Sequence, residues 1–283
     1  MMARSIADLI SDATGRLSAV TPTPALDAEL LLCAACGLTR TELAARHALE
    51  LTAQQSSHLS DLIDRRTVGE PVAYLLGHKE FWSLDLAVNP STLIPRPETE
   101  QLVEQVLTLI PPDTPCRVAD LGTGSGAVAL AIASERPQVH VTATDISQIA
   151  LQVASANALK FGIHNVAFLC ADWFEPVVES GFRVIVSNPP YVRSHDPLLE
   201  ASTRYEPREA LFAGEDGLQA LRSICAEAAT HLEPAGALIL EHSHDQGPAL
   251  QALLSAAGFS SIVTRADGAG LPRVTLGRLV RKA

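Results

Sequence analysis

The chain of 283 residues lacks the features of several large classes of protein. No stretch approaches the ~20 consecutive apolar residues that a membrane-spanning helix needs, so we expect no membrane association. The start of the chain has no apolar core of an export signal before Asp8. Its 5 cysteines are an odd number and are scattered along the chain, which is typical of a reducing compartment. We therefore expect a cytoplasmic protein.

Basic charge is also scarce. The 21 Lys and Arg residues are outnumbered by 32 Asp and Glu residues, which gives a formal net charge of -11. A general nucleic-acid binder needs a basic face for phosphates, so we expect no direct nucleic-acid partner. The apolar fraction of 47% is ample for a core and excludes wholesale disorder. We find no internal repeat or low-complexity segment, and we expect a monomer.

The N-terminal region has the pattern of short helices. Three Ser or Thr residues stand three positions before an acid or an amide and match capping boxes: Ser5 with Asp8, Thr39 with Glu42, and Thr52 with Gln55. Gly37 and Gly69 are expected helix stops. No cluster of catalytic residue types occurs here. We therefore expect residues 1–77 to form a helical domain that docks a substrate.

Residues 78–95 change character and are expected to form a β-hairpin linker. Apolar and polar side chains alternate from Trp82 to Val88, and Asn89–Pro90 would then turn the chain toward Thr92–Ile94. Beyond this linker, Pro97 suits the first turn of a helix that runs to about Ile110.

Residues 96–283 alternate between strand and helix patterns. The expected strands are 116–121, 139–144, 165–170, 183–187, 236–242 and 273–277, and the expected helices are 126–135, 147–161, 216–231 and 246–257. This alternation predicts an α/β domain with an open, mostly parallel, doubly wound sheet. The long polar connection 192–215 is expected to have local structure of its own and to shape access to a site.

A glycine-rich loop joins the first of these strands to its helix. Gly122, Gly124 and Gly126 permit a tight turn and let a ligand approach the backbone. On their own they are equally compatible with a turn that needs glycine only for packing. Asp145 stands at the end of the next strand, where a carboxylate can accept hydrogen bonds from both ribose hydroxyls. Its position favours a nucleoside ligand.

Three features bear on whether that ligand is NAD or S-adenosylmethionine. Asp120, just before the loop, would crowd a pyrophosphate but suits a sulfonium and an amino group. Asp172 could meet the adenine amino group. Trp173 could pack on the adenine ring, although an ordinary core aromatic is as good an interpretation of this residue taken alone. Together they favour S-adenosylmethionine.

The tetrapeptide Asn188-Pro189-Pro190-Tyr191 follows the apolar run Val184–Val186. An amide or exocyclic amine is a poor nucleophile because its nitrogen lone pair is delocalised. Asn188 Oδ1 and the Pro189 carbonyl, held by the rigid prolines, could accept hydrogen bonds from both N–H groups, and Tyr191 could lie against the planar group. This motif predicts methyl transfer to a planar nitrogen, with no metal.

Two other patterns carry less weight. Cys33 and Cys36 have metal or redox spacing, but no second pair completes a zinc site, and a helical core is the better interpretation. His242-Ser243-His244-Asp245 could be read as a metal cluster, but it ends a strand that should be buried. We interpret it as a strand end and turn.

Taken together, these motifs resemble the bacterial release-factor N5-glutamine methyltransferases of the HemK/PrmC type, and the resemblance covers nearly the whole chain. The segments that carry it are Leu93–Glu100, Asp120–Gly126, Asp172–Phe174, Ser187–Tyr191, Tyr205–Pro207 and Arg273–Gly277. It implies a seven-stranded methyltransferase domain behind a helical N-terminal domain and a hairpin link. It also implies methylation of the glutamine in the Gly-Gly-Gln loop of peptide chain release factors.

The resemblance also implies roles for particular residues. S-adenosylmethionine would contact the glycine loop (Gly122, Thr123, Gly124, Ser125 and Gly126) together with Asp145, Trp173 and Asn188, and the tetrapeptide from Asn188 to Tyr191 would hold the substrate glutamine. Two segments depart from the family pattern. Ser243 stands where relatives often have glycine, and residues 267–272 are more apolar than usual.

The main alternative is a DNA adenine N6-methyltransferase, because Asn-Pro-Pro-Tyr also serves base amines. Such an enzyme must flip out its base and hold the DNA backbone, which calls for a basic face and usually a target-recognition insert. This acidic chain has neither. A binding module that kept the fold and lost its activity is disfavoured by the intact motifs at both ends of the reaction.

Overall fold

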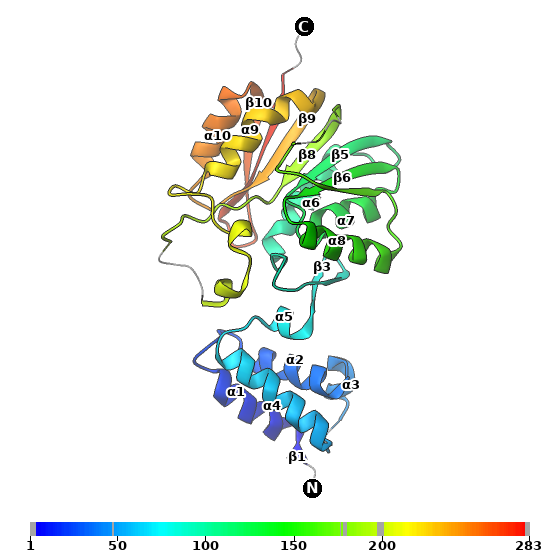
Figure 1. Cartoon of the computed structure of the whole chain (residues 1–283), viewed down its shortest axis with the longest axis vertical. Helices are drawn as coiled ribbons and strands as arrows, with labels where there is room; N and C mark the ends of the chain where they lie inside the picture. The colour runs from blue at the N-terminus through cyan, green and yellow to red at the C-terminus, as the bar shows by residue number, and fades with distance from the viewer. Residues whose placement is uncertain (1–3, 47, 176, 178–179, 197–200, 281–283) are drawn as a thin grey trace. The chain divides into compact units, whose positions relative to one another are not determined.

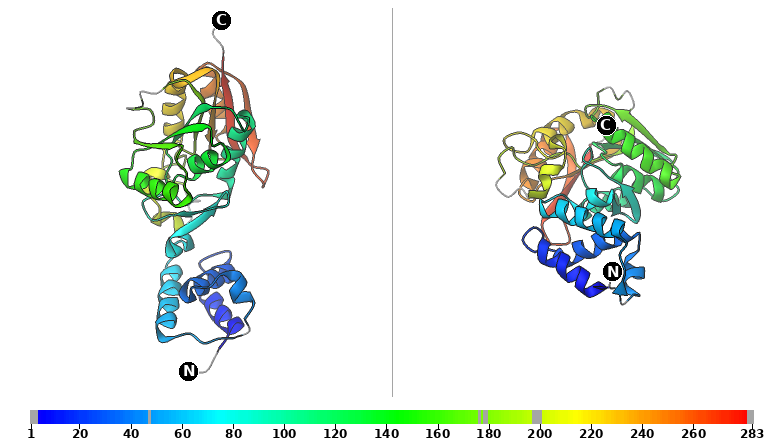
Figure 2. Two further views of the ribbon diagram at one scale, coloured as in Figure 1. Left: turned by 90° about the vertical axis from the view of Figure 1, so that its right-hand side faces the viewer. Right: turned by 60° about the horizontal axis from the view of Figure 1, so that its bottom comes forward.

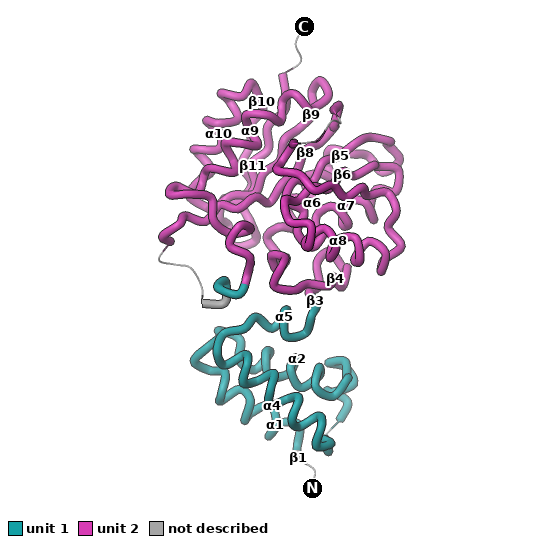
Figure 3. Tube along the Cα trace, viewed as in Figure 1, with its two compact units in different colours: residues 1–78, 200–205 teal, residues 79–199, 206–283 magenta. Residues whose placement is uncertain are grey.

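The computed structural model describes residues 4–46, 48–175, 177, 180–196 and 201–280. The chain divides into two compact units, drawn in different colours in Figure 3. One consists of residues 1–78 and 200–205, and the other of residues 79–199 and 206–283. The short segment 200–205 therefore joins the first unit, although it belongs to the long polar connection within the α/β part of the sequence.

The first unit is built from short helices, as the sequence predicts. They are α1 (Ile6–Leu17), α2 (Pro24–Cys36), α3 (Arg40–Ala44), α4 (Ala53–Thr67) and α5 (Val72–Leu76) (Figure 1). Complete capping boxes start α3 at Thr39 and α4 at Thr52, and the Ser5 side chain caps α1. A two-residue antiparallel pair, β1 (Arg4–Ser5) with β2 (Ala48–Leu49), was not predicted.

The linker contains a β-hairpin, and the chain turns at Asn89–Pro90 as predicted, where Thr92 N donates to Asn89 O at 3.0 Å, but the hairpin itself turns earlier. The strands are β3 (His78–Phe81) and β4 (Leu84–Ala87), and the chain turns at Trp82 and Ser83, whose φ angles are 51° and 61°. Left-handed backbone usually calls for glycine or asparagine, so the residue types do not announce this turn. Tertiary hydrogen bonds hold it, since Trp82 donates from its backbone to Glu100 and from its indole to Glu135.

The second unit contains the predicted doubly wound sheet, with seven strands in the order β10-β11-β9-β8-β5-β6-β7. Pairing is parallel from β9 to β7, whereas β11 and β10 are antiparallel. The strand bounds are Cys116–Leu121 for β5, Val139–Asp145 for β6, Val166–Cys170 for β7, Phe182–Ser187 for β8, Leu232–Glu241 for β9, Phe259–Ala266 for β10 and Pro272–Leu279 for β11. No pattern in the sequence located β10, because most of its residues are exposed and polar residues interrupt its apolar ones.

Helices cover both faces of this sheet (Figures 1 and 2). One face packs against α6 (Glu100–Leu109), α7 (Ala127–Glu135) and α8 (Gln148–Phe161), and the other against α9 (Gln219–His231) and α10 (Gly247–Ala256). A 3-10 turn, η1 (Pro97–Thr99), precedes α6. Each helix lies close to its predicted range. None of the helices within the described ranges is both long and apolar enough to cross a membrane.

The sheet places the predicted motifs together at the carboxyl ends of its parallel strands. β5 lies between β6 and β8, so the chain leaves β5 toward one side of the sheet and later returns to pair on its other side. The carboxyl ends of parallel strands at such a switch point form the usual ligand crevice of doubly wound sheets. The glycine loop, Asp172 and Asn188 follow these strand ends, and Asp145 is the last residue of β6.

Candidate functional site

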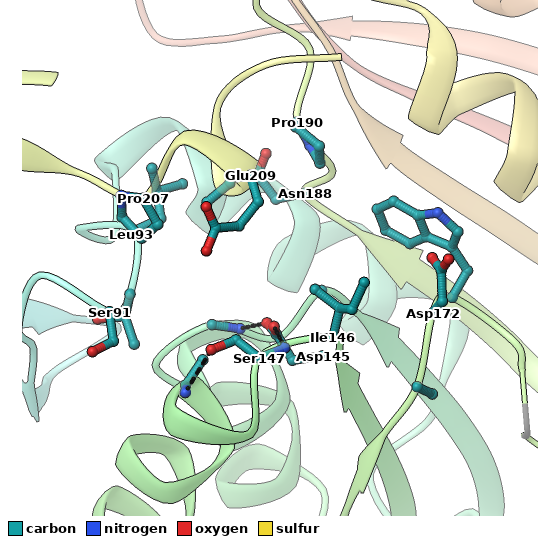
Figure 4. Close-up of a pocket in the computed structure, with 17 residues that line it drawn as sticks. Ser91, Leu93, Asp145, Ile146, Ser147, Asp172, Asn188, Pro190, Pro207 and Glu209 are labelled. Atoms are coloured by element: carbon teal, nitrogen blue, oxygen red, sulfur yellow. Dashed lines mark hydrogen bonds between the residues drawn. The ribbon is translucent and has the colours of Figure 1, made fainter. Parts of the chain in front are cut away.

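A cavity in the second unit opens at the carboxyl ends of β5, β6, β7 and β8 (Figure 4). It is lined by Ser91, Thr92, Leu93, Gly122, Gly124, Asp145, Ile146, Ser147, Ala150, Ala171, Asp172, Trp173, Asn188, Pro190, Pro207, Glu209 and Ala210. The structure thus brings together residues from both predicted motifs. A smaller adjoining cavity shares Leu93 and Asn188 with it and is lined also by Thr123 and Ser125.

The three glycines of the loop have different roles. All have positive φ angles, of 71°, 56° and 86° in chain order. Gly124 has open space where a side chain would stand, whereas a Cβ at Gly122 would contact the Trp173 ring at 3.6 Å. A Cβ at Gly126 would meet Leu130 and Ala154 at 3.1 Å, and Gly126 lines neither cavity. The first two glycines keep the cavity open, and the third permits helix packing.

Asp145 is fixed in the cavity wall by backbone donors. Its Oδ2 accepts a hydrogen bond of 2.9 Å from Gly124 N, and its Oδ1 accepts one of 2.9 Å from Ser147 N (Figure 4). Burial raises the pKa of this carboxyl group, and the two hydrogen bonds oppose that rise. Since a carboxylate oxygen has more than one lone pair, each still has capacity to accept from a ligand hydroxyl.

The wall beyond Asp145 combines apolar surface with a further acid. Trp173 is half-buried, and Asp172 is exposed. The sequence did not single out Ile146, which lines the cavity although 62% of it is exposed. An isoleucine and an indole beside carboxylates suit a flat heterocycle that carries hydroxyl and amino groups.

Asp120 lies beside the loop, with one of its carboxylate oxygens engaged by loop and helix donors. It is 1% exposed, and its Oδ2 accepts from Thr123 Oγ1 at 2.6 Å and from Ala129 N at 3.1 Å. Burial raises its pKa to about 7. It borders the smaller cavity, where its first effect is to hold the loop in shape.

The Asn188–Tyr191 turn begins directly after β8. Ser187 Oγ donates to Leu121 O at 2.6 Å and so fastens the end of β8 to the end of β5. Asn188 Nδ2 donates to Thr99 Oγ1 at 3.1 Å, and no residue within the described ranges donates to its Oδ1. The amide oxygen is therefore the part of Asn188 that can serve a ligand.

The other three residues of the turn differ in their surroundings. Pro190 lines the main cavity with Asn188, whereas Pro189 is buried. Tyr191 is half-buried and lines neither cavity, and its hydroxyl donates to Glu241 Oε1 at 3.1 Å. Burial, together with the nearby Glu241 charge, raises the pKa of Tyr191. The role of its ring against a substrate stays a prediction.

Glu206 joins two segments that line the cavity. It is buried, accepts from Ile94 N at 3.0 Å, and forms an ion pair with Arg96. It thereby ties the linker around Leu93 to the segment of Pro207 and Glu209, which is part of the long polar connection. Leu93 belongs to the predicted linker, and Pro207 and Glu209 belong to the connection 192–215 that was expected to shape access to a site. The sequence did not single out Glu209 itself.

The minor cysteine and histidine patterns have structural explanations. Cys33 and Cys36 lie on α2, where burial raises the pKa of both thiols. His242 is buried, and its ring nitrogens lie 2.8 Å from Ser243 O and 2.8 Å from Thr275 Oγ1. Within the described residues, no group of three or more His, Cys, Asp or Glu side chains is arranged to hold a metal ion.

Comparison with known proteins extends this picture over the whole chain. Residues 8–77 match the model of the PrmC N-terminal domain, and residues 99–204 match that of the methyltransferase small domain. The release factor glutamine methyltransferase of Coxiella burnetii is 46% identical over 97% of this chain and 99% of its own length. The protein of the same name from Yersinia pestis is 49% identical over 90% of this chain and 92% of its own length.

Solved structures share the fold at greater distance. The 16S rRNA N2 G1207 methyltransferase of Thermus thermophilus, solved with AdoMet and guanosine, superposes with a TM-score of 0.52 at 18% identity. The match covers 71% of this chain and 49% of that protein. This likeness concerns the fold alone.

Proposed function

Because the chain belongs to the family of release factor glutamine methyltransferases, we propose that it methylates the side-chain amide nitrogen, N5, of the glutamine in the Gly-Gly-Gln loop of translation release factors. The methyl donor is S-adenosylmethionine. One observation carries the proposal beyond the family name. Asn188 and Pro190 of the Asn-Pro-Pro-Tyr turn line the same cavity as the glycine loop and Asp145. A ligand bound to the loop and Asp145 could therefore also reach the turn.

The cavity fits the donor. Asp145 presents a carboxylate for the ribose hydroxyls, Ile146 and Trp173 offer apolar surface for adenine, and Asp172 stands where it could accept from the adenine amino group. Gly122 and Gly124 leave the loop backbone accessible. When bound, S-adenosylmethionine supplies an electrophilic methyl group on a positively charged sulfur.

The turn supplies what a weakly nucleophilic amide needs. Asn188 Oδ1 accepts one N–H of the glutamine side chain and the Pro189 carbonyl accepts the other. These two hydrogen bonds fix the amide nitrogen and orient its lone pair toward the methyl group. Tyr191 lies against the planar amide. Positioning therefore provides the catalysis, and no strong base is required before transfer.

Partner and location follow from the same activity. Release factors act in translation, so we propose a cytoplasmic enzyme that works as a monomer, with the helical unit of residues 1–78 docking the release factor. A DNA substrate is disfavoured by the excess of acidic residues, which would repel a phosphate backbone.

The proposal is tested by incubating the protein with S-adenosylmethionine labelled in its methyl group and with either a purified release factor or DNA that contains adenine. We expect label in the release factor and none in DNA. Asn188→Ala serves as the control for contaminating methyltransferases and should abolish most of the incorporation. Label in DNA with none in the release factor would replace this proposal with the adenine methyltransferase alternative.

A further inference from the structure

Two buried side chains stand behind the Asn188–Tyr191 turn, and the sequence assigned neither of them a role. Thr99 ends η1 and is 4% exposed, and its Oγ1 accepts from Asn188 Nδ2 at 3.1 Å. Glu241 ends β9 and is 1% exposed, and its Oε1 accepts from the Tyr191 hydroxyl at 3.1 Å. Both ends of the turn are therefore held by hydrogen bonds, and Thr99 also lines the smaller cavity beside Asn188.

One of the two carboxyl oxygens of Glu241 is left unpaired. This second oxygen, Oε2, is buried and has no hydrogen-bond partner within the described residues. Burial raises the pKa of Glu241 to about 7, and the hydroxyls of Thr99 and Tyr191 oppose that rise.

Each support fixes one side chain of the turn. Thr99 Oγ1 holds the NH2 group of Asn188, which leaves Oδ1 for a ligand. Glu241 Oε1 holds the Tyr191 hydroxyl and so fixes the direction of the tyrosine ring.

We propose that Glu241 and Thr99 are positioning residues that set the orientation of the Asn188 amide and of Tyr191 for the transfer reaction. The inference rests on the proposed function for its effect on rate. Its structural content, the fixed orientation of one amide, does not depend on the substrate. A buried acid with an unpaired oxygen costs stability compared with a well-paired or apolar group, so packing alone does not account for glutamate here.

Single-turnover rates with release factor test the chain of contacts. Thr99→Val keeps the shape and removes the acceptor, so we expect a loss of about tenfold or more, while Thr99→Ser keeps most of the rate. Thr108→Val, at an exposed position on α6, is the matched control and should be neutral. Glu241 lines neither cavity, so S-adenosylmethionine affinity should change by less than about twofold in Glu241→Gln.

A double-mutant cycle separates positioning from general damage. If Thr99 acts through Asn188, Thr99→Val should have almost no further effect in an Asn188→Ala background. An equal loss in both backgrounds would overturn the inference. Glu241→Gln is nearly isosteric but replaces the charged acceptor of the Tyr191 hydroxyl with an amide, so it should slow transfer as well. A wild-type rate in Glu241→Gln would also overturn the inference.

A second readout needs no activity. In NMR spectra of the ligand-free protein, the Asn188 side-chain NH2 pair can be assigned by its absence in Asn188→Ala. We expect its signals to shift and its solvent exchange to accelerate in Thr99→Val, but not in Thr99→Ser or Thr108→Val. An unchanged pair in Thr99→Val would refute the positioning role. Absence of methyl transfer by the wild-type protein would instead count against the proposed function.

Discussion

Asp145 Oδ2 accepts a hydrogen bond of 2.9 Å from the backbone N–H of Gly124, which connects the end of β6 to the loop after β5. The acid and the glycine loop are therefore one structural unit. A side chain at residue 124 would be strained by its φ of 56°. The same hydrogen bond orients the carboxylate before any ligand arrives, which lowers the entropy cost of binding.

Replacing Asp145 should weaken the binding of the cofactor. We expect Asp145→Ala to reduce the free energy of S-adenosylmethionine binding by about 1–3 kcal/mol, through the loss of charge-assisted hydrogen bonds. Titration calorimetry provides the measurement. Asp85→Ala removes an acid that pairs with Lys160 at the surface and should leave the affinity unchanged. Tight NAD binding without S-adenosylmethionine binding would refute the predicted cofactor.

Asn188 should matter more for rate than for stability. Asn188→Ala should stay folded with a near-normal melting temperature, bind the cofactor, and lose on the order of a hundredfold or more in single-turnover rate. Asn188→Asp keeps an acceptor oxygen but loses the NH2 group that donates to Thr99. If only the acceptor oxygen is essential, Asn188→Asp should be faster than Asn188→Ala. If the hydrogen bond to Thr99 is also essential, Asn188→Asp should be as slow as Asn188→Ala. Near-wild-type turnover by Asn188→Ala would refute the role.

The helical unit should be dispensable for binding the cofactor but needed for methylation of a whole release factor. Its core is made of its own helices, including Leu17, Leu31 and Leu62, while separate clusters form the core of the sheet. A chain that starts at Lys79 should therefore bind S-adenosylmethionine and methylate a whole release factor poorly. A full rate on the whole factor, measured beside the intact protein, would rule out a docking role.

The pH dependence of stability should report on Glu241. Burial raises the pKa of Glu241 from 4.5 to about 7 in the folded protein. A raised pKa means that the folded state binds the extra proton, so the contribution of Glu241 is present below pH 4.5 and is lost as the pH rises through about 7. Burial raises the pKa of Asp120 as well. Asp120 is present in both the wild-type protein and Glu241→Gln, so its contribution cancels when the two are compared.

Glu241→Gln should remove this dependence. Relative to the variant, wild-type protein should lose about 1–3 kcal/mol of unfolding free energy between about pH 5 and about pH 8. Urea unfolding at both pH values gives the difference. A constant difference between the two proteins would mean that the pKa of Glu241 is not raised by folding.

Local signals in the sequence predicted most of the fold. Capping boxes at Thr39 and Thr52 marked helix starts, and apolar runs marked the central strands, because each of these depends on near neighbours in the chain. β10 escaped because an edge strand with a polar face lacks an apolar run. The turn at Trp82 and Ser83 escaped because tertiary contacts, and not the residue types, hold its left-handed backbone.

The same distinction applies to the site. Motif residues such as Asp145 and Asn188 are contiguous with strand ends, so their meeting in one cavity could be foreseen from the sheet topology. Thr99 and Glu241 lie far along the chain from the residues they support. Thr99 falls within the family segment Leu93–Glu100 and Glu241 directly precedes His242, but no local pattern gives either residue a role beside the turn. Gly126 was predicted to bind the cofactor, yet it lines neither cavity, because one motif can serve binding and packing at different glycines.

The central claim is that this site methylates the side-chain nitrogen of one glutamine. Tandem mass spectrometry of a release factor, after reaction with the protein and labelled S-adenosylmethionine, tests it most directly. We predict a single labelled methyl group on the side-chain amide of the Gly-Gly-Gln glutamine, with none after reaction with Asn188→Ala. An unmodified glutamine, or label only on another residue of the factor, would contradict the account.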